Sequence, residues 1–346
     1  MEFSPGTLVT PNVRLTRLLG EGGMGSVWVG DHLTLETQVA VKFILPELSQ
    51  DDPEILARFR REAKLAARIK SQHVVRVFDH GVMGDDTPFI VMELLEGSSL
   101  ADWLDLQGNL TLDETAEMVN QVASVLAKAH EIGVVHRDIK PENVFLVDSE
   151  DRLFVKVLDF GIAKQTRVPK GSLQTGIGVL VGTPMYMSPE QLLRAGGVDF
   201  HADLWALSVV AYRAVTGLEP FSGETVPAII VAITEGEFDP PSAVASQPVP
   251  PSLDRWFRRA LARNASERFS SARELAESFR AAATGTYGSS EAAQTAGGAT
   301  AAGRSAALVT SPTVPAPGDR PAGQMGEQGG RAAERRPPPP PKPKPR

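Results

Sequence analysis

Two short polar motifs constrain this chain more than any other feature. The first is His136-Arg137-Asp138-Ile139-Lys140-Pro141-Glu142-Asn143, and the second, Asp159-Phe160-Gly161, begins sixteen residues after it. Together they place an acidic residue, a lysine, an asparagine and a second acidic residue on two adjacent segments. This set offers a carboxylate for a hydroxyl group and two oxygen donors for a divalent metal ion.

These are the parts that phosphoryl transfer needs, because there the protein mainly positions groups and neutralises charge. The sequence here resembles the protein kinase family from about Val13 to about Phe279. The resemblance implies an α+β, bilobal fold in a kinase domain over 13–280. A small β-rich lobe with one regulatory helix would span about 13–95, and a larger, mostly helical lobe about 96–280.

The local patterns agree with this division. The strands predicted for the small lobe are 14–19, 26–30, 39–44, 74–78 and 89–92. A helix is predicted to begin near Asp51-Asp52-Pro53 and to run over 54–70. Further helices are predicted from a capping box at Thr111-Leu112-Asp113-Glu114 to about His130, and over 202–215, 225–234, 252–262 and 270–279.

A glycine cluster lies between the first two strands, as Gly20-Glu21-Gly22-Gly23-Met24-Gly25. Alone this pattern also fits a plain tight hairpin. Glycine lets backbone approach phosphate without a Cβ clash, and the cluster is followed by a strand, unlike a dinucleotide-binding loop. In the kinase resemblance, Gly20, Gly22 and Gly25 belong to the nucleotide phosphate loop.

The resemblance assigns Lys42 to the α- and β-phosphates of ATP, with Glu62 as its carboxylate partner on the predicted helix. Arg60 and Arg61 leave a second interpretation open, in which Glu62 forms a surface ion pair.

The same resemblance assigns a set of residues to the adenine site. The roof would be formed by Leu19, Val27 and Ala40, and the floor by Phe145. The gatekeeper would be Met92, and backbone groups for the purine would come from Glu93 and Leu95. Ordinary core packing is the alternative for the apolar members.

The resemblance also implies the chemical roles. Asp138 would orient the substrate hydroxyl, Lys140 would steady the transferred phosphoryl group, and Asn143 and Asp159 would hold Mg²⁺. ATP and Mg²⁺ are thus the implied cofactors, with Mn²⁺ as a substitute. His136 and Phe160 are expected to pack the site rather than react.

Lys140 within this loop, and Gly182-Thr183-Pro184 ahead of Ser188-Pro189-Glu190, resemble serine/threonine kinases, in which Thr183 would help to shape the substrate site. The glycine loop resembles that of bacterial eukaryotic-like kinases. Glu190 and Arg268 are expected to form a buried ion pair, and Asp203 to hold the backbone of the catalytic loop.

Arg137 precedes Asp138, and in kinases with this pair the arginine commonly meets a phosphate on the activation loop, here about 162–187. Thr166, Ser172 and Thr175 are the candidate acceptors. Thr175, seven residues before Gly182, is the predicted regulatory phosphosite.

Composition excludes several other classes. The chain has 346 residues and no cysteine, so disulfides and thiol chemistry are excluded. The chain has a net charge of −7, and residues 281–346, with eight basic and four acidic side chains, have a net charge of +4. Residues 1–280 therefore have a net charge of −11, which argues against nucleic-acid binding. Without an apolar run for a membrane span or a signal peptide, a cytoplasmic location is expected.

Residues 281–346 are rich in Ala, Gly and Pro and end in a basic polyproline stretch, so this tail is predicted to be disordered.

The partners that the kinase resemblance implies are protein substrates with Ser or Thr acceptors. Self-association for autophosphorylation and a partner for the tail are left open. A silent pseudokinase and a small-molecule kinase are the alternatives; pseudokinases typically lose Lys42, Asp138, Asn143 or Asp159, all present here, and small-molecule kinases usually lack the 182–190 segment.

Overall fold

The structure is a computed structural model. It describes residues 3–22, 25–44, 64, 68–84, 87–149, 152–159, 184–193 and 198–287. The predicted helix over 54–70 therefore lies mostly outside the described residues, as does almost all of the tail.

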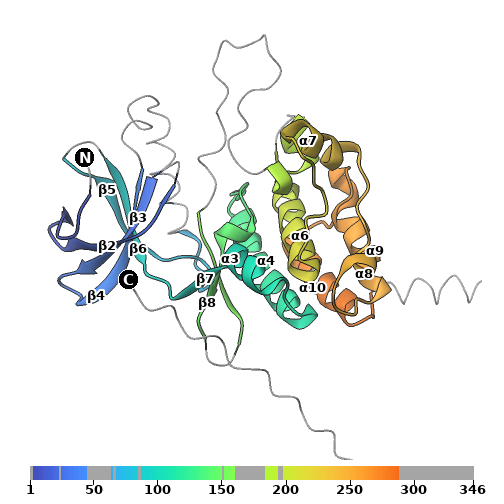
Figure 1. The fold of residues 1–346 in the computed structure, drawn as a ribbon, viewed down its shortest axis with the longest axis horizontal. Coiled ribbons are helices and arrows are strands. Elements are labelled where there is room, and N and C mark those ends of the chain that lie inside the picture. The colour runs from blue at the N-terminus through green and yellow to red at the C-terminus, as the bar shows by residue number, and fades with distance from the viewer. Residues whose placement is uncertain are drawn as a thin grey trace, which may run out of the picture. The chain divides into compact units, whose positions relative to one another are not determined.

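The small lobe is a six-stranded antiparallel sheet (Figure 1). Its strands, in spatial order, are β1 (Leu8–Thr10), β2 (Val13–Gly22), β3 (Gly25–His32), β4 (Thr37–Ile44), β6 (Pro88–Glu93) and β5 (Val77–Val82). The strand predicted over 74–78 is displaced toward the C-terminus. Val74 forms a bridge with Val157 and the Val75 N–H donates to the Val157 carbonyl, so these backbones are not available to the sheet.

Side-chain alternation gives this sheet two distinct faces. One face packs into an apolar core that includes Trp28, Val41 and Phe43, all less than 9% exposed. Because Val27 pairs with Lys42 in the β3–β4 register, these two side chains lie on the opposite face. One face of the sheet is thus part of the core, and the other face presents the charged side chain of Lys42.

A second, three-stranded sheet was not predicted from the sequence. It consists of β7 (Gly97–Ser99), β8 (Val144–Val147) and β9 (Phe154–Val157), all antiparallel. Strands of three or four residues show too little alternation to be recognised. Strands β8 and β9 lie between the two polar motifs in the sequence, so this sheet positions the end of the first motif and the start of the second.

The large lobe is helical, and the bilobal α+β fold is confirmed. Its helices are α3 (Leu100–Gln107), α4 (Leu112–Glu131), α5 (Pro189–Leu193), α6 (His201–Thr216), α7 (Val226–Glu235), α8 (Pro241–Val244), α9 (Pro251–Ala260) and α10 (Ala272–Ala283). Single turns of 3₁₀ helix span Pro141–Asn143, Pro184–Tyr186 and Ala265–Glu267. The predicted capping box is present, with Thr111 and Glu114 bonding reciprocally at the start of α4.

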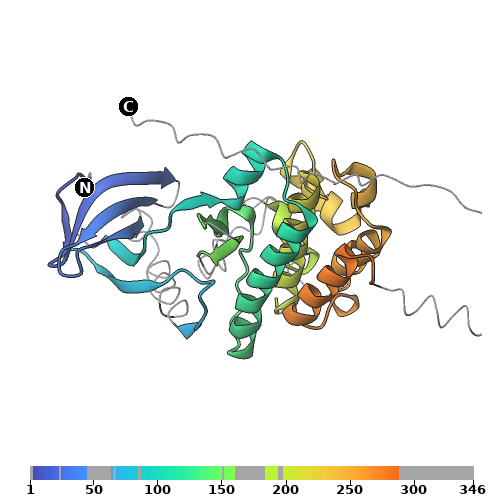
Figure 2. The same ribbon diagram turned by 90° about the horizontal axis from the view of Figure 1, so that it is seen from below.

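Helices α4, α6, α9 and α10 lie side by side (Figures 1 and 2). Helix α6 is buried over nearly its whole surface, as an apolar helix in the middle of a lobe must be. Trp205 of α6 and Trp256 of α9 are both fully buried. Any side chain fixed to α6 is therefore held by the best-packed part of the lobe.

Helix α10 extends beyond residue 280, where composition had placed the start of the tail. Ala281, Ala282 and Ala283 continue the helix because alanine is a strong helix former, and Ala282 is fully buried. The Tyr287 carbonyl accepts a hydrogen bond from Arg255, and its ring packs against the core. The packed part of the chain thus reaches Tyr287.

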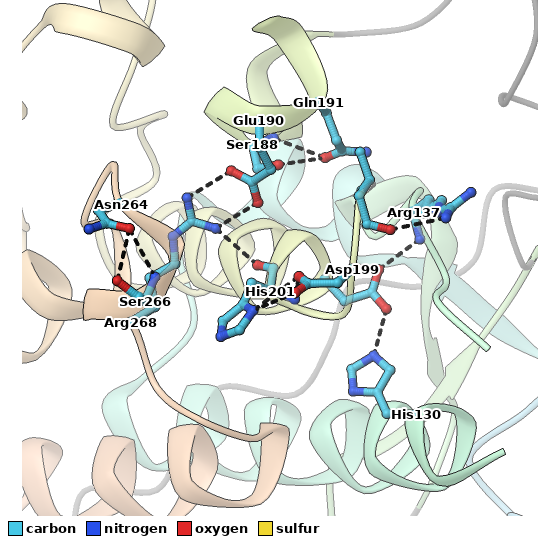
Figure 3. A network of polar contacts seen from close by, with 12 residues as sticks. His130, Arg137, Ser188, Glu190, Gln191, Asp199, His201, Asn264, Ser266 and Arg268 are labelled. Carbon is cyan, nitrogen blue, oxygen red and sulfur yellow. Dashed lines mark hydrogen bonds and ion pairs between the residues drawn. The ribbon is translucent and has the colours of Figure 1, made fainter. Parts of the chain in front are cut away.

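The expected ion pair between Glu190 and Arg268 is confirmed. Two guanidinium nitrogens of Arg268 donate to the two carboxylate oxygens of Glu190 at 2.8 and 2.9 Å (Figure 3). The Arg268 side chain is fully buried and its guanidinium lies 4.9 Å from the Trp205 ring. It also donates to the carbonyls of Ala262, Arg263 and His201.

We expect Glu190→Gln to lower the free energy of unfolding by about 2 kcal/mol at neutral pH, less than a fully broken buried pair because three carbonyls still accept from Arg268. Burial raises the pKa of Glu190, but the hydrogen bonds and charge of Arg268 lower it by more. The contribution is therefore complete above the usual carboxyl pKa of 4.5 and is lost as pH falls through the folded-state pKa.

Denaturant unfolding at neutral and acidic pH measures this difference. Glu117→Gln is the matched control, since Glu117 pairs with Arg280 with both side chains more than a third exposed, and should cost less than about 1 kcal/mol. A difference between wild type and Glu190→Gln that stays constant into acid would contradict the assignment.

Candidate active site

The buried carboxylate of Asp203 organises the catalytic loop. Its Oδ2 accepts from the His136 N–H at 2.8 Å, and its Oδ1 accepts from the Arg137 N–H at 2.7 Å. The His130 Nε2 donates to Oδ2 at 2.8 Å, a contact that the sequence did not predict. Asp203 is in the first turn of α6. Its bonds to the N–H groups of His136 and Arg137 confirm that it holds the backbone of the catalytic loop.

The loop backbone is strained where it turns. Arg137 has a φ of 64°, in the left-handed region that non-glycine residues seldom adopt. The bond from its N–H to Asp203 offsets part of this cost. Asp159 has a φ of 41°, so a residue of each motif is in a left-handed conformation.

His136 connects the two motifs and is neutral. It is fully buried, and its Nε2 lies 3.2 Å from the Leu158 carbonyl oxygen, which can only accept. Its Nδ1 lies 3.3 Å from the Asp138 N–H, which can only donate, so the proton is on Nε2. Burial lowers the pKa of His136. The ring therefore bridges the backbone before Asp159 to the backbone of Asp138.

The side chains of the first motif converge on Asp138. The Asn143 Nδ2 donates to the Asp138 carbonyl oxygen at 2.8 Å and to the Asp138 Oδ2 at 3.1 Å. The Lys140 Nζ lies 3.8 Å from the same Oδ2. The carboxylate is thus oriented by an amide and faces an ammonium group.

Lys42 and Asp159 join the small lobe to the second motif. The Lys42 Nζ lies 2.6 Å from the Asp159 Oδ1, and the two side chains are 24% and 40% exposed. The surrounding protein raises the pKa of Asp159, but the charge and hydrogen bond of Lys42 lower it by more. Asp159 is therefore ionised at neutral pH.

The donor set fits a magnesium ion. Both hydrogens of Asn143 Nδ2 are engaged by Asp138, which fixes the amide so that its Oδ1 is the atom left for a cation. Asp159 supplies an anionic oxygen. Two protein oxygens suit Mg²⁺, which completes its shell with water and phosphate oxygens. In the described part of the chain there is no cluster of three or more His, Asp or Glu that could hold a metal by itself.

Three of the seven predicted adenine residues share one face of the small-lobe sheet. In the registers of β3, β4 and β6, Val27 pairs with Lys42, and Ala40 pairs with Met92. These side chains lie on the face opposite the apolar core. Leu19 is 44% exposed at the end of β2, and Phe145 is in β8.

We call the connection from Glu93, at the end of β6, to the start of β7 at Gly97 the hinge, and Glu93 and Leu95 both belong to it. Glu93 ends β6, its N–H donates to the Arg76 carbonyl at 2.9 Å, and Leu95 lies between β6 and β7.

The glycine loop contains a constraint that the sequence did not reveal. A Cβ at Gly25, where φ is 152°, would lie 1.9 Å from the Phe43 carbonyl oxygen. No atom of the described residues lies within 4 Å of a Cβ built at Gly20 or Gly22. Gly25 is therefore required by the fold itself, whereas the described residues leave space at Gly20 and Gly22.

Several residues named from the sequence lie outside the described residues: Arg60, Arg61, Glu62, Phe160, Thr166, Ser172, Thr175 and Thr183. Their roles stay predictions. Arg137, their expected counterpart in regulation, donates from Nη2 to the Val198 carbonyl at 3.1 Å. Its Nε is buried and has no hydrogen-bond partner among the described residues.

The sequence model described as "Protein kinase domain" matches residues 13–279. The chain belongs to the protein kinase family. Similar proteins include the serine/threonine-protein kinase Pkn1 of Myxococcus xanthus, 41% identical over 261 residues, which are 75% of this chain and 36% of that protein. PknH of Mycobacterium tuberculosis is 37% identical over 262 residues, 76% of this chain and 40% of that protein.

A solved structure of the Mycobacterium tuberculosis PknI kinase domain is also similar, with a TM-score of 0.64 at 28% identity over 82% of this chain and all of that one. The resemblance to bacterial serine/threonine kinases is thus confirmed. The chain spans between about a third and a half of the length of the first curated relatives, at 36–50%. None of the helices in the described ranges has the length and apolar character needed to cross a membrane.

We expect Asp203→Asn to lower the free energy of unfolding by about 3 kcal/mol, because an amide nitrogen would face one of the backbone donors of His136 or Arg137. The exchange rates of these two amide hydrogens should rise. Denaturant unfolding and hydrogen exchange measure both effects.

Asp105→Asn is the matched control. Asp105 pairs with Arg213 but is 71% exposed, so the change should cost less than about 1 kcal/mol. Equal stability of the two variants would show that Asp203 does not hold the loop.

Proposed function

We propose that this chain is an ATP-dependent serine/threonine protein kinase, which transfers the γ-phosphoryl group of ATP to protein Ser and Thr hydroxyls. The main support is the convergence of Asn143 and Lys140 on the Asp138 carboxylate, next to the Lys42–Asp159 pair. The site then brings together oxygen donors for a metal ion, cations for phosphate and a carboxylate that can accept the hydroxyl proton. The names of the bacterial relatives support the same substrate class.

In this proposal Asp138 accepts a hydrogen bond from the substrate hydroxyl and takes its proton on a carboxylate oxygen as the hydroxyl oxygen attacks the γ-phosphorus of ATP; the bond from that phosphorus to the bridging oxygen breaks and ADP leaves. The hydrogen bonds from Asn143 keep the carboxylate in position. Since His136 has its only ring proton on the Leu158 side, it orients the loop and takes no part in proton transfer.

Charge on the transferred group is balanced by the two lysines. Lys140, 3.8 Å from Asp138, is placed to neutralise the phosphoryl oxygens, and Lys42 to hold the α- and β-phosphates. Asn143 and Asp159 would hold Mg²⁺, which neutralises phosphate charge when bound. Mn²⁺ prefers similar oxygen donors and is the expected substitute.

Leu19, Val27 and Ala40 are proposed to form the roof of the adenine site and Phe145 its floor, with Met92 as the gatekeeper. Glu93 and Leu95 would offer backbone groups to the purine. A cytoplasmic location, self-association for autophosphorylation and a partner for the tail stay predictions.

Asp138→Asn should fold and bind Mg-ATP as wild type does, because the phosphate and metal groups are unchanged. Its turnover should fall by roughly a hundredfold or more with the loss of the proton acceptor. An ATP phosphotransfer assay with phosphosite mapping, alongside a nucleotide-binding titration, measures both. Glu131→Gln, an exposed change at the end of α4, is the control. Turnover near wild type in Asp138→Asn would exclude this mechanism.

We further propose that a phosphate on Thr175 activates the enzyme by binding Arg137. The support is the buried Nε of Arg137, which has no partner among the described residues, next to the catalytic Asp138. A phosphate brings a charge of about −1.5 to −2 and oxygens that accept from a guanidinium. Without the phosphate, this buried donor has no acceptor among the described residues, and an unsatisfied buried donor costs stability.

Mass spectrometry of the active enzyme should find phosphate on Thr175, and Thr175→Ala should slow substrate phosphorylation. Thr166→Ala and Ser172→Ala are the matched controls in the same loop and should retain the wild-type rate. Full activity of a protein whose loop is unmodified would contradict this mechanism, and would leave the proposed chemistry of Asp138 intact.

A further inference from the structure

A cavity of about 500 Å³ lies beside the hinge, away from Asp138. Its lining comes from the segment 69–77, from Glu93 at the end of β6 and from Lys156 in β9. This volume is typical of sites for small molecules. None of these lining residues except Glu93 belongs to the proposed ATP site.

The lining combines apolar and polar groups with a cationic rim. Ile69, Val74 and Val75, each no more than 6% exposed, supply a small apolar part of the lining, and Ser71 and Gln72 add polar groups to it. Lys70 and Arg76 are exposed at the rim. Such a surface suits a ligand with an apolar body and one anionic group.

The charges of the cavity do not cancel. Glu93 is the single acidic residue of the lining, and its Oε1 accepts from the Lys156 Nζ at 2.5 Å and from the Arg76 N–H at 2.6 Å. Lys156 therefore compensates Glu93. The Lys70 and Arg76 side chains have no carboxylate within 4 Å among the described residues, so two positive charges remain for an anion.

The cavity walls are held by backbone hydrogen bonds. The Val157 N–H donates to the His73 carbonyl at 2.8 Å, and the Val75 N–H donates to the Val157 carbonyl at 3.1 Å. The Glu93 N–H donates to the Arg76 carbonyl at 2.9 Å. A ligand would thus enter a largely preformed site and order few groups on binding.

The cavity shares two residues with the surroundings of the proposed adenine site. Glu93 is the hinge residue expected to contact the purine, and Lys156 pairs with Phe145, the expected adenine floor, in the β8–β9 register. Arg76 is bonded to Glu93 through both its N–H and its carbonyl, so an anion held by the Arg76 side chain would shift Glu93. Binding at the cavity would then weaken binding of the nucleotide.

We propose that this hinge cavity binds a small amphiphilic anion, with an aromatic or aliphatic body and one carboxylate, sulfonate or phosphate group, and that its occupancy lowers the affinity for ATP. The effect on ATP affinity rests on the proposed function, whereas binding of the anion does not. Each claim is tested by an equilibrium measurement that needs no enzymatic activity.

The probe is anilinonaphthalene sulfonate, an aromatic anion whose fluorescence rises in apolar sites, titrated into the full chain. Lys70→Gln/Arg76→Gln should raise its Kd about tenfold, since two exposed cations are lost. The matched control is Arg258→Gln/Arg273→Gln, which removes two exposed arginines from α9 and α10. The control should bind the probe as wild type does. Failure of wild type to bind the probe, or equal Kd values in both double variants, would overturn the proposal.

The coupling is tested with a non-hydrolysable ATP analogue and Mg²⁺. At saturation the analogue should raise the Kd of the probe by about fivefold and no further, and saturating probe should weaken the analogue by the same factor. A probe Kd that rises in proportion to the analogue concentration would place the probe in the nucleotide site and overturn the proposal. If the analogue does not bind, the proposed function fails, and the titration of the double variants still decides the cavity.

Discussion

The carboxylate of Asp203 is the constraint on which the rest of the site depends. It is fully buried, and it accepts from two consecutive backbone N–H groups and from His130. A buried carboxylate without such donors would be strongly destabilising, so the loop and the carboxylate stabilise each other. The left-handed Arg137 is held by this contact, and Asp138 follows it directly. The position of the proposed proton acceptor is thus set by a helix of the large lobe.

Helix α6 couples this loop to the segment that ends in α5. Asp203 binds the catalytic loop, while Trp205, two residues later, lies under the guanidinium that pairs with Glu190. Because α6 is buried almost all round, neither contact can shift without disturbing the core.

The charged groups of the site already form pairs: Lys42 lies next to Asp159, and Lys140 next to Asp138. Phosphate and metal would then exchange partners with existing pairs, at less cost than creating new buried charges.

Much of the fold could be predicted because the elements are long and periodic. The capping box of Thr111 and Glu114, the helix over α6 and the hairpin around the glycine cluster all follow from local chemistry. The small sheet of β7, β8 and β9 could not be predicted, because its strands are too short to show alternation. The register of β5 also escaped prediction, since Val74 and Val75 bond to Val157, which is distant in sequence.

The family, the proposed chemical groups and the Glu190–Arg268 pair could all be inferred from the sequence, because motif spacing specifies residue types in order along the chain. Which atoms meet became known from the folded structure. It placed His130 on Asp203, put the His136 proton toward Leu158, and brought the Phe43 carbonyl against Gly25. The two histidine contacts are hydrogen bonds between residues distant in sequence, and the contact at Gly25 is a steric limit set by the neighbouring strand. Local propensity and spacing contain no information about such distances, so the geometry of the site and the hinge cavity follow from the fold alone.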